Sequence, residues 1–443
     1  MTIRPLHLRV LLVALGLVVA AMAFAQTRDV RIDITTGQGQ RIRIQCEPLQ
    51  AGGNRDAGAS SVEADEVLAN DLDWSAVFAV HRTWSGEPAP AELQAIVSGR
   101  WTVEGSMVKL AGEVRDLPGR KLILARDYRG PLKDRRALVH RFADDIVLQF
   151  TGEAGVAQTR IAYATVASGV KELHVMDYDG ANRAPLTADR SIATSPSWSY
   201  DGSLLLFTSY RGGKGPQLFV VPSAGGKVFA VSTRGGINTS ASYSPDGREI
   251  ACTLSFEGSP DIYMLDARGG APRRLTHARG IDTSPAWSPT GQEIAFTSDR
   301  TGVSQVYVMD REGGNVRRLT FEVDNTDSPS WSPAGDRIAF VSRTGGGFDI
   351  WICRVDGSGA RPVVTGGSNE NPKWSPDGRH LVFSSNREGA PSLFVTDLDE
   401  RAPRKLDTGG AAVSPAWSPR PGSASSAAQA GPERGADQGG IKR

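Results

Sequence analysis

The 443-residue sequence lacks short motifs that are typical of zinc enzymes and serine hydrolases. Its six histidines form no H-x-x-x-H pair and join no cluster of carboxylates, so the spacing of a zinc site is missing. No G-x-S-x-G segment occurs, which argues against the nucleophile elbow of a serine hydrolase. Three cysteines without a C-x-x-C pair offer neither a disulfide framework nor a redox motif. We therefore expect no catalytic residue, no metal site and no cofactor.

Net charge is also small. Lys and Arg number 50 against 49 Asp and Glu, and removal of the first 25 residues would take away Arg4 and Arg9, leaving about −1. This balance gives no electrostatic footprint for nucleic acid or for an anionic membrane. Cys46, Cys252 and Cys353 are expected to be buried free thiols.

Long apolar runs are missing except for one at the N-terminus. Arg4 and Arg9 precede the apolar run from Val10 to Ala23, and small residues end at Ala25 before Gln26. The run is short for a membrane span. The pattern predicts a secretory signal over residues 1–25, cleaved between Ala25 and Gln26, and a mature chain that does not span the membrane.

What the sequence has in abundance is a repeated phrase, an aromatic residue followed by Ser-Pro-Asp-Gly or a near copy. The aromatic residues are Trp198, Tyr243, Trp287, Trp331, Trp374 and Trp417. Their spacings of 45, 44, 44, 43 and 43 residues are typical of solenoids and propellers. Each repeat contains four short runs rich in β-branched and aromatic residues, separated by Gly-containing turns. This pattern favours the four-stranded blades of a β-propeller.

The two ends of the repeat array complete each other. The run Ile161–Tyr163 resembles a second strand without an aromatic phrase before it, and Val413–Pro419 is such a phrase without a second strand after it. We expect these segments to pair and close the ring, which hides its sheet edges. The predicted fold is mainly β, with a six-bladed β-propeller at 158–420 preceded by a small α+β domain at 26–157. The Gly-, Ala- and Ser-rich tail at 421–443 is expected to be disordered.

The small domain is predicted from weaker signals. Leu138, Phe142, Ile146 and Phe150 recur at every fourth position, which predicts a helix from Asp134 to about Phe150. Other expected elements are a helix that starts at Ser61 as its N-cap, a candidate short helix at Ala91–Ile96, and strands near Arg100–Val103, Met107–Val114 and Leu122–Ala125.

Polar residues precede each aromatic residue by three to five positions. In a propeller this segment leads from the outer strand of one blade to the inner strand of the next, so the segments would ring one mouth of the central channel. The candidate partner-binding residues are Thr194, Ser195, Asn238, Ser240, Thr283, Ser284, Asp327, Ser328, Glu370 and Asn371. The alternative is that they only shape Asx- and ST-turns. The tryptophans are expected in the core, with a sugar-stacking platform as the alternative.

The layout resembles the TolB family of the Tol–Pal envelope system. The resemblance rests on the signal, on Val30-Arg31-Ile32-Asp33-Ile34 after it, on the α+β domain, on Thr159–Tyr163 at the junction, and on the blade phrase. It implies a monomeric periplasmic adaptor rather than an enzyme. The arm Val30–Ile34 would bind TolA, and the channel mouth would bind the lipoprotein Pal and other outer-membrane or periplasmic proteins. Such an adaptor would maintain outer-membrane integrity and constriction in cell division.

The sequence leaves alternatives open. The segment Ala51–Ser60 and the C-terminal tail depart from the family layout, and Ser284 stands where the family often has Glu. The propeller could instead bind peptidoglycan or another periplasmic ligand, or accompany a hydrolase. Because Val30, Ile32 and Ile34 alternate with polar residues, the arm could equally be a permanent first strand of the small domain.

Overall fold

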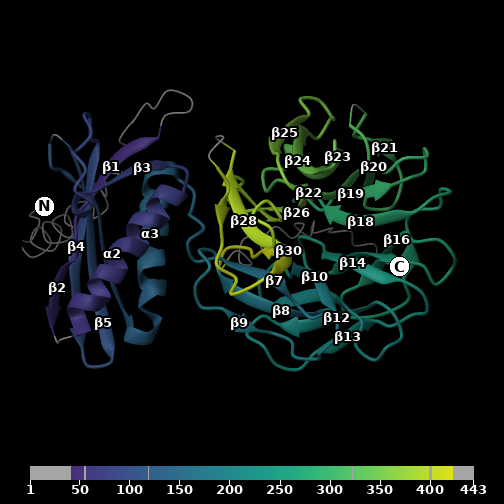
Figure 1. Ribbon diagram of the computed structural model, residues 1–443, viewed down its shortest axis with the longest axis horizontal. Helices are drawn as coiled ribbons and strands as arrows, with labels where there is room; N and C mark the ends of the chain where they lie inside the picture. The colour runs from purple at the N-terminus through teal and green to yellow at the C-terminus, as the bar shows by residue number, and fades with distance from the viewer. Residues whose placement is uncertain (1–40, 54–55, 118, 322, 399–401, 423–443) are drawn as a thin grey trace, which may run out of the picture.

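The computed structural model describes residues 41–53, 56–117, 119–321, 323–398 and 402–422. The predicted signal, its cleavage site, the arm Val30–Ile34 and nearly all of the predicted tail lie outside these ranges. The described chain has two parts, a sheet covered by two helices and a ring of six four-stranded sheets (Figure 1). The fold is therefore mainly β, a six-bladed β-propeller preceded by a small α+β region, as the sequence predicts.

The small domain is built on a mixed sheet of six strands in the order β3-β1-β4-β5-β6, with β2 beside β4. Its strands are β1 (Ile42–Cys46), β2 (Gln50–Gly53), β3 (Phe78–Arg82), β4 (Ala95–Glu104), β5 (Met107–Asp116) and β6 (Leu122–Pro131). Two short 3₁₀ turns, η1 (Thr83–Ser85) and η2 (Leu132–Asp134), follow β3 and β6. The helices α2 (Asp56–Trp74) and α3 (Arg135–Thr151) lie on the side of the sheet that faces the propeller (Figure 1).

Helix α3 confirms the helix predicted from apolar residues at every fourth position. Two of these residues, Phe142 and Ile146, are fully buried. Helix α2 begins five residues before the predicted N-cap Ser61. Ser61 lies inside the helix, and its hydroxyl donates a hydrogen bond to the Gly58 carbonyl oxygen at 2.9 Å. Because this bond to the preceding turn satisfies the hydroxyl inside the helix, Ser61 does not mark a boundary.

The short helix predicted at Ala91–Ile96 is wrong. Glu92 has a φ of 65°, which is incompatible with a right-handed helix. Ala95 already belongs to β4, where it pairs with Ile44 of β1 and with Asp116 of β5. The two neighbouring strands supply the backbone hydrogen bonds that a helical turn would otherwise have to make.

Each propeller blade is an antiparallel sheet of four strands, numbered from the channel outward. Five blades are continuous in sequence: β10–β13 (Ala193–Trp198, Leu204–Ser209, Gln217–Pro222, Phe229–Ser232), β14–β17 (Asn238–Tyr243, Glu249–Leu254, Asp261–Asp266, Arg273–Arg274), β18–β21 (Asp282–Trp287, Glu293–Ser298, Gln305–Asp310, Arg317–Arg318), β22–β25 (Thr326–Trp331, Arg337–Thr344, Gly347–Arg354, Arg361–Val364) and β26–β29 (Asn369–Trp374, His380–Ser385, Ser392–Asp397, Arg404–Lys405). Short, β-branched strands between glycine turns produce this repeat.

The sixth blade is formed by both ends of the repeat array. Strand β30 (Ala412–Trp417) pairs with β7 (Arg160–Ala167), which continues into β8 (Val170–Asp177) and β9 (Ala184–Pro185). Val413 lies opposite Ala164 and Trp417 opposite Ile161. The predicted closure of the ring is confirmed, and in Figure 1 the yellow C-terminal strand lies beside the teal strand β7.

The tryptophans of the repeated phrase connect neighbouring blades. All five are at most 9% exposed, which confirms their place in the core and leaves no face for stacking a sugar. The indole nitrogen of Trp198 donates to the Ala416 carbonyl oxygen at 3.0 Å, and that of Trp374 donates to the Ser330 carbonyl oxygen at 3.0 Å. Each bond reaches the inner strand of the preceding blade, so the aromatic residue both fills the gap between blades and fixes their spacing.

The small domain shares one continuous core with two blades of the propeller. Leu72 and Ile146 from α2 and α3 belong to the same buried cluster as Val382, Leu393 and Trp417 from the propeller. All three cysteines are buried and free, as predicted. In the part of the chain that the structure describes, neither helix has the length and apolar character needed to cross a membrane.

Candidate functional site

The six inner strands that surround the channel share an unusual backbone. Each has a bulge in its pairing with the second strand of its blade. At this bulge the third residue of the strand has a φ between 51° and 55°: Ser195, Ser240, Ser284, Ser328, Asn371 and Ser414. A left-handed residue with a Cβ costs about 1 kcal/mol or more. Its repetition in all six blades identifies it as a built feature that directs these side chains.

The six left-handed residues line a single cavity of about 100 Å³ in the channel, which we call the channel cavity. The side chains of Ser195, Ser240, Ser284 and Asn371 have no hydrogen-bond partner among the described residues. The Ser414 hydroxyl lies 3.1 Å from that of Thr194. The cavity therefore presents several free hydroxyl and amide groups at fixed positions on a closed ring.

The other predicted channel residues lie around this cavity. Thr194 and Thr283 are half-buried at the second position of their strands. Asp327 and Glu370 occupy the same position in the next two blades and are exposed at the mouth. The Asp327 carboxylate accepts a hydrogen bond from the Thr297 hydroxyl at 2.8 Å. The structure thus brings nine of the ten predicted residues to the channel cavity or its mouth.

The placement of Asn238 at the mouth is wrong. Its side chain is fully buried and donates to the carbonyl oxygens of Pro216, Arg234 and Gly236, while its Oδ1 accepts from the Ser232 hydroxyl at 2.7 Å. The first position of the inner strand points into the blade, and its residue is buried in every blade. Because a buried amide needs internal hydrogen bonds, the Asn238 side chain connects its blade to the preceding one and is not available to a partner.

Ser414 and Lys373 are among the residues of the channel cavity that were missed from the sequence. Ser414 completes the ring, and its position three residues before Trp417 matches the offset of Ser195 before Trp198. Lys373 also lines the cavity, one residue before Trp374, where the other blades carry Ser or Ala. Comparing the residues at equal offsets in all six blades would have found both.

A second polar group joins the small domain to the propeller. The Nδ1 atom of His140 on α3 lies 2.7 Å from the Asp71 carboxylate on α2, and the Tyr178 hydroxyl donates to the same carboxylate at 2.6 Å. Arg136 forms ion pairs with Asp179, which follows β8, and with Glu63. Charged groups from both helices are therefore connected to the loop between β8 and β9.

Three of these side chains could in principle gather a metal ion, because ligand atoms of Asp71, His140 and Asp179 lie within 4.8 Å of one another. Burial alone lowers the pKa of His140, but the Asp71 and Asp179 carboxylates outweigh it and raise the pKa to about 9. The imidazole would have to lose its proton before it could bind a metal, and the Asp179 carboxylate is already paired with the Arg136 guanidinium. The arrangement is that of a salt-bridge network.

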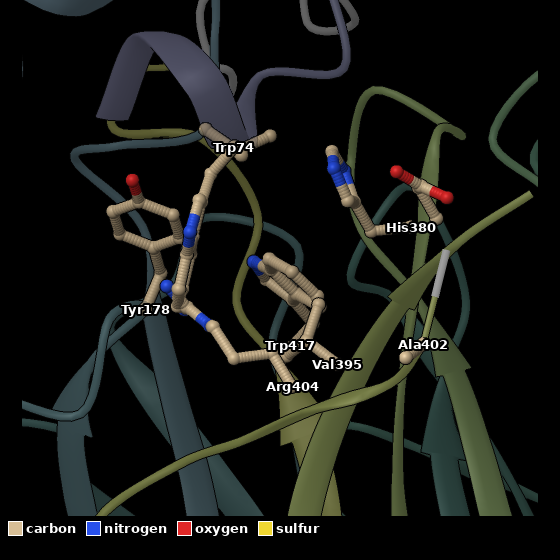
Figure 2. Close-up of a pocket in the computed structure, with 9 residues that line it drawn as sticks. Trp74, Tyr178, His380, Val395, Ala402, Arg404 and Trp417 are labelled. Carbon is tan, nitrogen blue, oxygen red and sulfur yellow. The ribbon is translucent and has the colours of Figure 1, made fainter. Parts of the chain in front are cut away.

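Next to this network lies a mostly apolar pocket of about 150 Å³ at the domain junction. Figure 2 shows Trp74 and Tyr178 on one side of the pocket, with His380 and Trp417 across from them, while Arg404 reaches toward Trp74 and Tyr178. Burial lowers the pKa of Arg404 to about 9. Asp397 also lines the pocket, and its carboxylate forms a 2.7 Å ion pair with Arg41, just before β1.

The fold and the polar channel define a β-propeller protein with an N-terminal α+β domain attached to its ring. The family described as "TolB beta propeller domain" matches residues 147–421, more than half of the chain. The chain therefore belongs to the TolB family.

Individual relatives agree with this assignment. The chain is 39% identical over 168 residues to the Tol-Pal system protein TolB of Desulfosudis oleivorans, covering 38% of this chain and 37% of that protein. It is 36% identical over 261 residues to the protein of the same name from Anaeromyxobacter dehalogenans strain 2CP-1, covering 55% and 59%. The matched stretches thus span less than two thirds of these relatives. A crystal structure of TolB from Acinetobacter baumannii superposes with a TM-score of 0.76 at 25% identity, covering 86% of this chain and 97% of that one.

Proposed function

We propose that the protein is a periplasmic adaptor of the Tol–Pal system. In this proposal the channel mouth of the propeller binds Pal, and the arm Val30–Ile34 binds TolA. The protein would thereby link the inner membrane to the outer membrane, preserve envelope integrity and support constriction in cell division. Family membership, the predicted signal before Gln26 and the names of the relatives support this assignment.

The observation that carries the proposal is the ring of free polar groups at the channel cavity. The bulges hold one polar side chain at the equivalent position of each of the six blades, and in the described chain the Ser414 hydroxyl is the one of these that already has a partner, Thr194. A partner that places a loop here would find donors and acceptors already oriented, so little conformational entropy would be lost on binding. Binding at a propeller mouth needs no catalytic residue, in agreement with the expected lack of one.

The channel mouth and the small domain lie at opposite ends of the propeller. The inner strands begin at the channel mouth with residues such as Asp327 and end at the repeated turn phrase. Contacts with the small domain come from the latter end. Arg379, directly after the phrase, approaches Glu153 at 3.9 Å, and Asp179 in the loop between β8 and β9 pairs with Arg136. Pal bound at the mouth would therefore lie at the end of the propeller away from the small domain.

The proposal is tested by measuring binding of the purified mature protein to the periplasmic domain of Pal. Ser284→Trp would fill the channel mouth and should weaken binding at least about tenfold, a loss of roughly 1.4 kcal/mol. Ser358→Trp is the matched control, because Ser358 is an exposed residue of the turn between β24 and β25, at the opposite end of the channel. It should bind Pal like the wild type.

Thermal unfolding of both variants separates lost binding from lost folding. A melting temperature close to wild type, together with weak binding by Ser284→Trp alone, supports the channel mouth as the contact. Equal binding by both variants would place the Pal contact on another face. If the wild-type protein binds peptidoglycan fragments but not Pal, the adaptor assignment fails in favour of the peptidoglycan-binding alternative.

A further inference from the structure

Lys373 is the one charged residue among the side chains that line the channel cavity. It precedes Trp374 on β26, and the equivalent positions in the other blades are occupied by Ser or Ala. Among the described residues it has neither an ion-pair nor a hydrogen-bond partner. An ammonium group that is partly removed from water and has no partner loses solvation free energy. A bound anion would offset this loss.

The surroundings of Lys373 contain no built-in counter-ion. In the described part of the chain, no residue that lines the channel cavity carries a carboxylate. Burial lowers the pKa of Lys373, and the Asp327 carboxylate opposes this effect. Asp327 lies at the mouth, however, and its carboxylate already accepts hydrogen bonds from the Thr297 hydroxyl and from the backbone amide of Ser328.

The remaining lining groups are suited to an oxyanion. The hydroxyls of Ser195, Ser240 and Ser284 and the amide of Asn371 have no partner among the described residues, so each can donate to a bound oxygen atom. The cavity of about 100 Å³ has room for a group of a few non-hydrogen atoms. A cation would meet the ammonium group of Lys373, and an apolar group would leave the hydroxyls unsatisfied.

We propose that the channel cavity is a binding site for a small oxyanion, a carboxylate or phosphate group, held by Lys373 and the left-handed serines. The ammonium group supplies the charge, and the ring of hydroxyls supplies the oriented donors. The group can come from a free anion or from an acidic side chain that a protein inserts through the mouth. Only the second source rests on the proposed function.

In the first experiment, the mature protein is titrated with sodium acetate and with sodium phosphate at constant ionic strength, and calorimetry measures the binding. The wild type should bind with a millimolar dissociation constant. Lys373→Met keeps the length of the side chain and removes its charge, and it should bind at least about tenfold more weakly. Lys405→Met, which removes an exposed lysine paired with Glu388 in the same blade, should match the wild type.

The second experiment distinguishes the two sources. Binding of the partner in the proposed function, the periplasmic domain of Pal, is measured at increasing acetate concentrations. Chloride at equal ionic strength is the control. If the partner inserts an acidic side chain, acetate weakens binding to the wild type and has no effect on Lys373→Met. If the site holds a free anion, acetate binds while partner affinity stays constant.

Two results would overturn the oxyanion site. One is the lack of acetate and phosphate binding by the wild type, together with partner binding that Lys373→Met leaves unchanged. The other is equal anion binding by the wild type and Lys373→Met. Either result leaves the adaptor proposal standing, because that proposal fails only if the wild type does not bind the partner. A melting curve for Lys373→Met establishes that the variant is folded.

Discussion

At the scale of single residues, the buried charges at the domain junction contribute to stability in a pH-dependent way. His140 carries a raised pKa because two carboxylates face it, Asp71 at 2.7 Å and Asp179 at 4.0 Å, while Arg136 opposes them. Asp71 is further held by the Tyr178 hydroxyl from the propeller side. Protonation of one imidazole therefore affects the contact between the two parts of the molecule.

The first prediction concerns the pH dependence of this contact. The pKa of His140 is about 9 in the folded protein, above its ordinary value of 6.5, so folding takes up a proton. Its stabilising effect is fully present below about pH 6.5 and disappears as the pH rises through 9, by roughly 3 kcal/mol at most. The difference in unfolding free energy between wild type and His140→Gln should therefore shrink from pH 6 to pH 9.5.

Urea unfolding at several pH values measures this difference. His277→Gln, a change on an exposed loop, is the control and should show no such trend relative to the wild type. A constant difference between wild type and His140→Gln across the whole range would mean that His140 is neutral in the folded protein. Burial raises the pKa values of Asp65 and Asp144 to about 6. Both residues are present in all three proteins, so their titration contributes to all three unfolding curves.

At the scale of secondary-structure elements, the short strand β30 makes several contributions to the stability of the propeller. It provides the inner strand of the sixth blade, and its Trp417 donates to the Thr159 hydroxyl at 2.8 Å. Just beyond it, the Ser418 hydroxyl accepts a hydrogen bond from the Arg160 amide. One six-residue strand therefore closes the ring, buries a large aromatic residue and secures the start of the propeller.

The second prediction is that a chain ending at Gly410 is severely destabilised. It would expose the edge of β7 and remove Trp417 from the shared core, a loss comparable to the whole unfolding free energy of about 5–15 kcal/mol. Circular dichroism melting should show a loss of cooperative unfolding near the wild-type temperature. A chain ending at Gly422 keeps β30 and should melt like the full-length protein. Wild-type melting of the shorter chain would refute the role of ring closure.

At the scale of the whole molecule, the structure connects the start of the small domain to the propeller. Arg41 lies at the end of the segment that contains the arm, and its guanidinium forms a largely buried ion pair with Asp397 at the end of β28. Asp397 also lines the pocket at the domain junction. The first residue of the described chain is therefore held by the propeller.

The third prediction is that binding at the arm and at the channel mouth is coupled. Deletion of Gln26–Ile34 should abolish TolA binding, leave the melting temperature near the wild type and change the affinity for Pal. This expectation assumes that the arm moves between a docked state and a state captured by TolA. A ligand can shift such an equilibrium only if its affinities for the two states differ, and such coupling is reciprocal. Calorimetric titration with each partner, alone and in the presence of the other, measures the coupling.

A matched variant separates the sequence of the arm from its length. Replacing Val30, Ile32 and Ile34 with serine keeps the length but removes the alternation needed to add a strand to a sheet edge, so TolA binding should again be lost. Retained TolA binding in both variants would place that contact elsewhere. Lost TolA binding with unchanged Pal affinity would keep the contact and reject the coupling.

Features that depend on neighbours in the chain could be read from the sequence. The turn phrase predicts six blades because Pro and Gly fix backbone dihedrals locally, and the two incomplete repeats predict the pairing of β30 with β7. The period-four row predicts α3 because a helix places such residues on one face. Local chemistry was insufficient at Ser61 and at Ala91–Ile96, where the helical bond to Gly58 and pairing with β1 and β5 decided the outcome.

Only the tertiary structure decided what the polar residues do. Asn238 and Ser240 are two positions apart, yet the bulge turns one into the blade and the other into the channel. Lys373 becomes notable only because five strands from other blades surround it without supplying a counter-ion. Asp71, His140 and Asp179 lie far apart in sequence and meet where the small domain packs on the propeller. The sequence by itself determined the repeating scaffold, because turns and strand periodicity are short-range effects, whereas side chains from distant segments acquire a shared environment only when the ring closes.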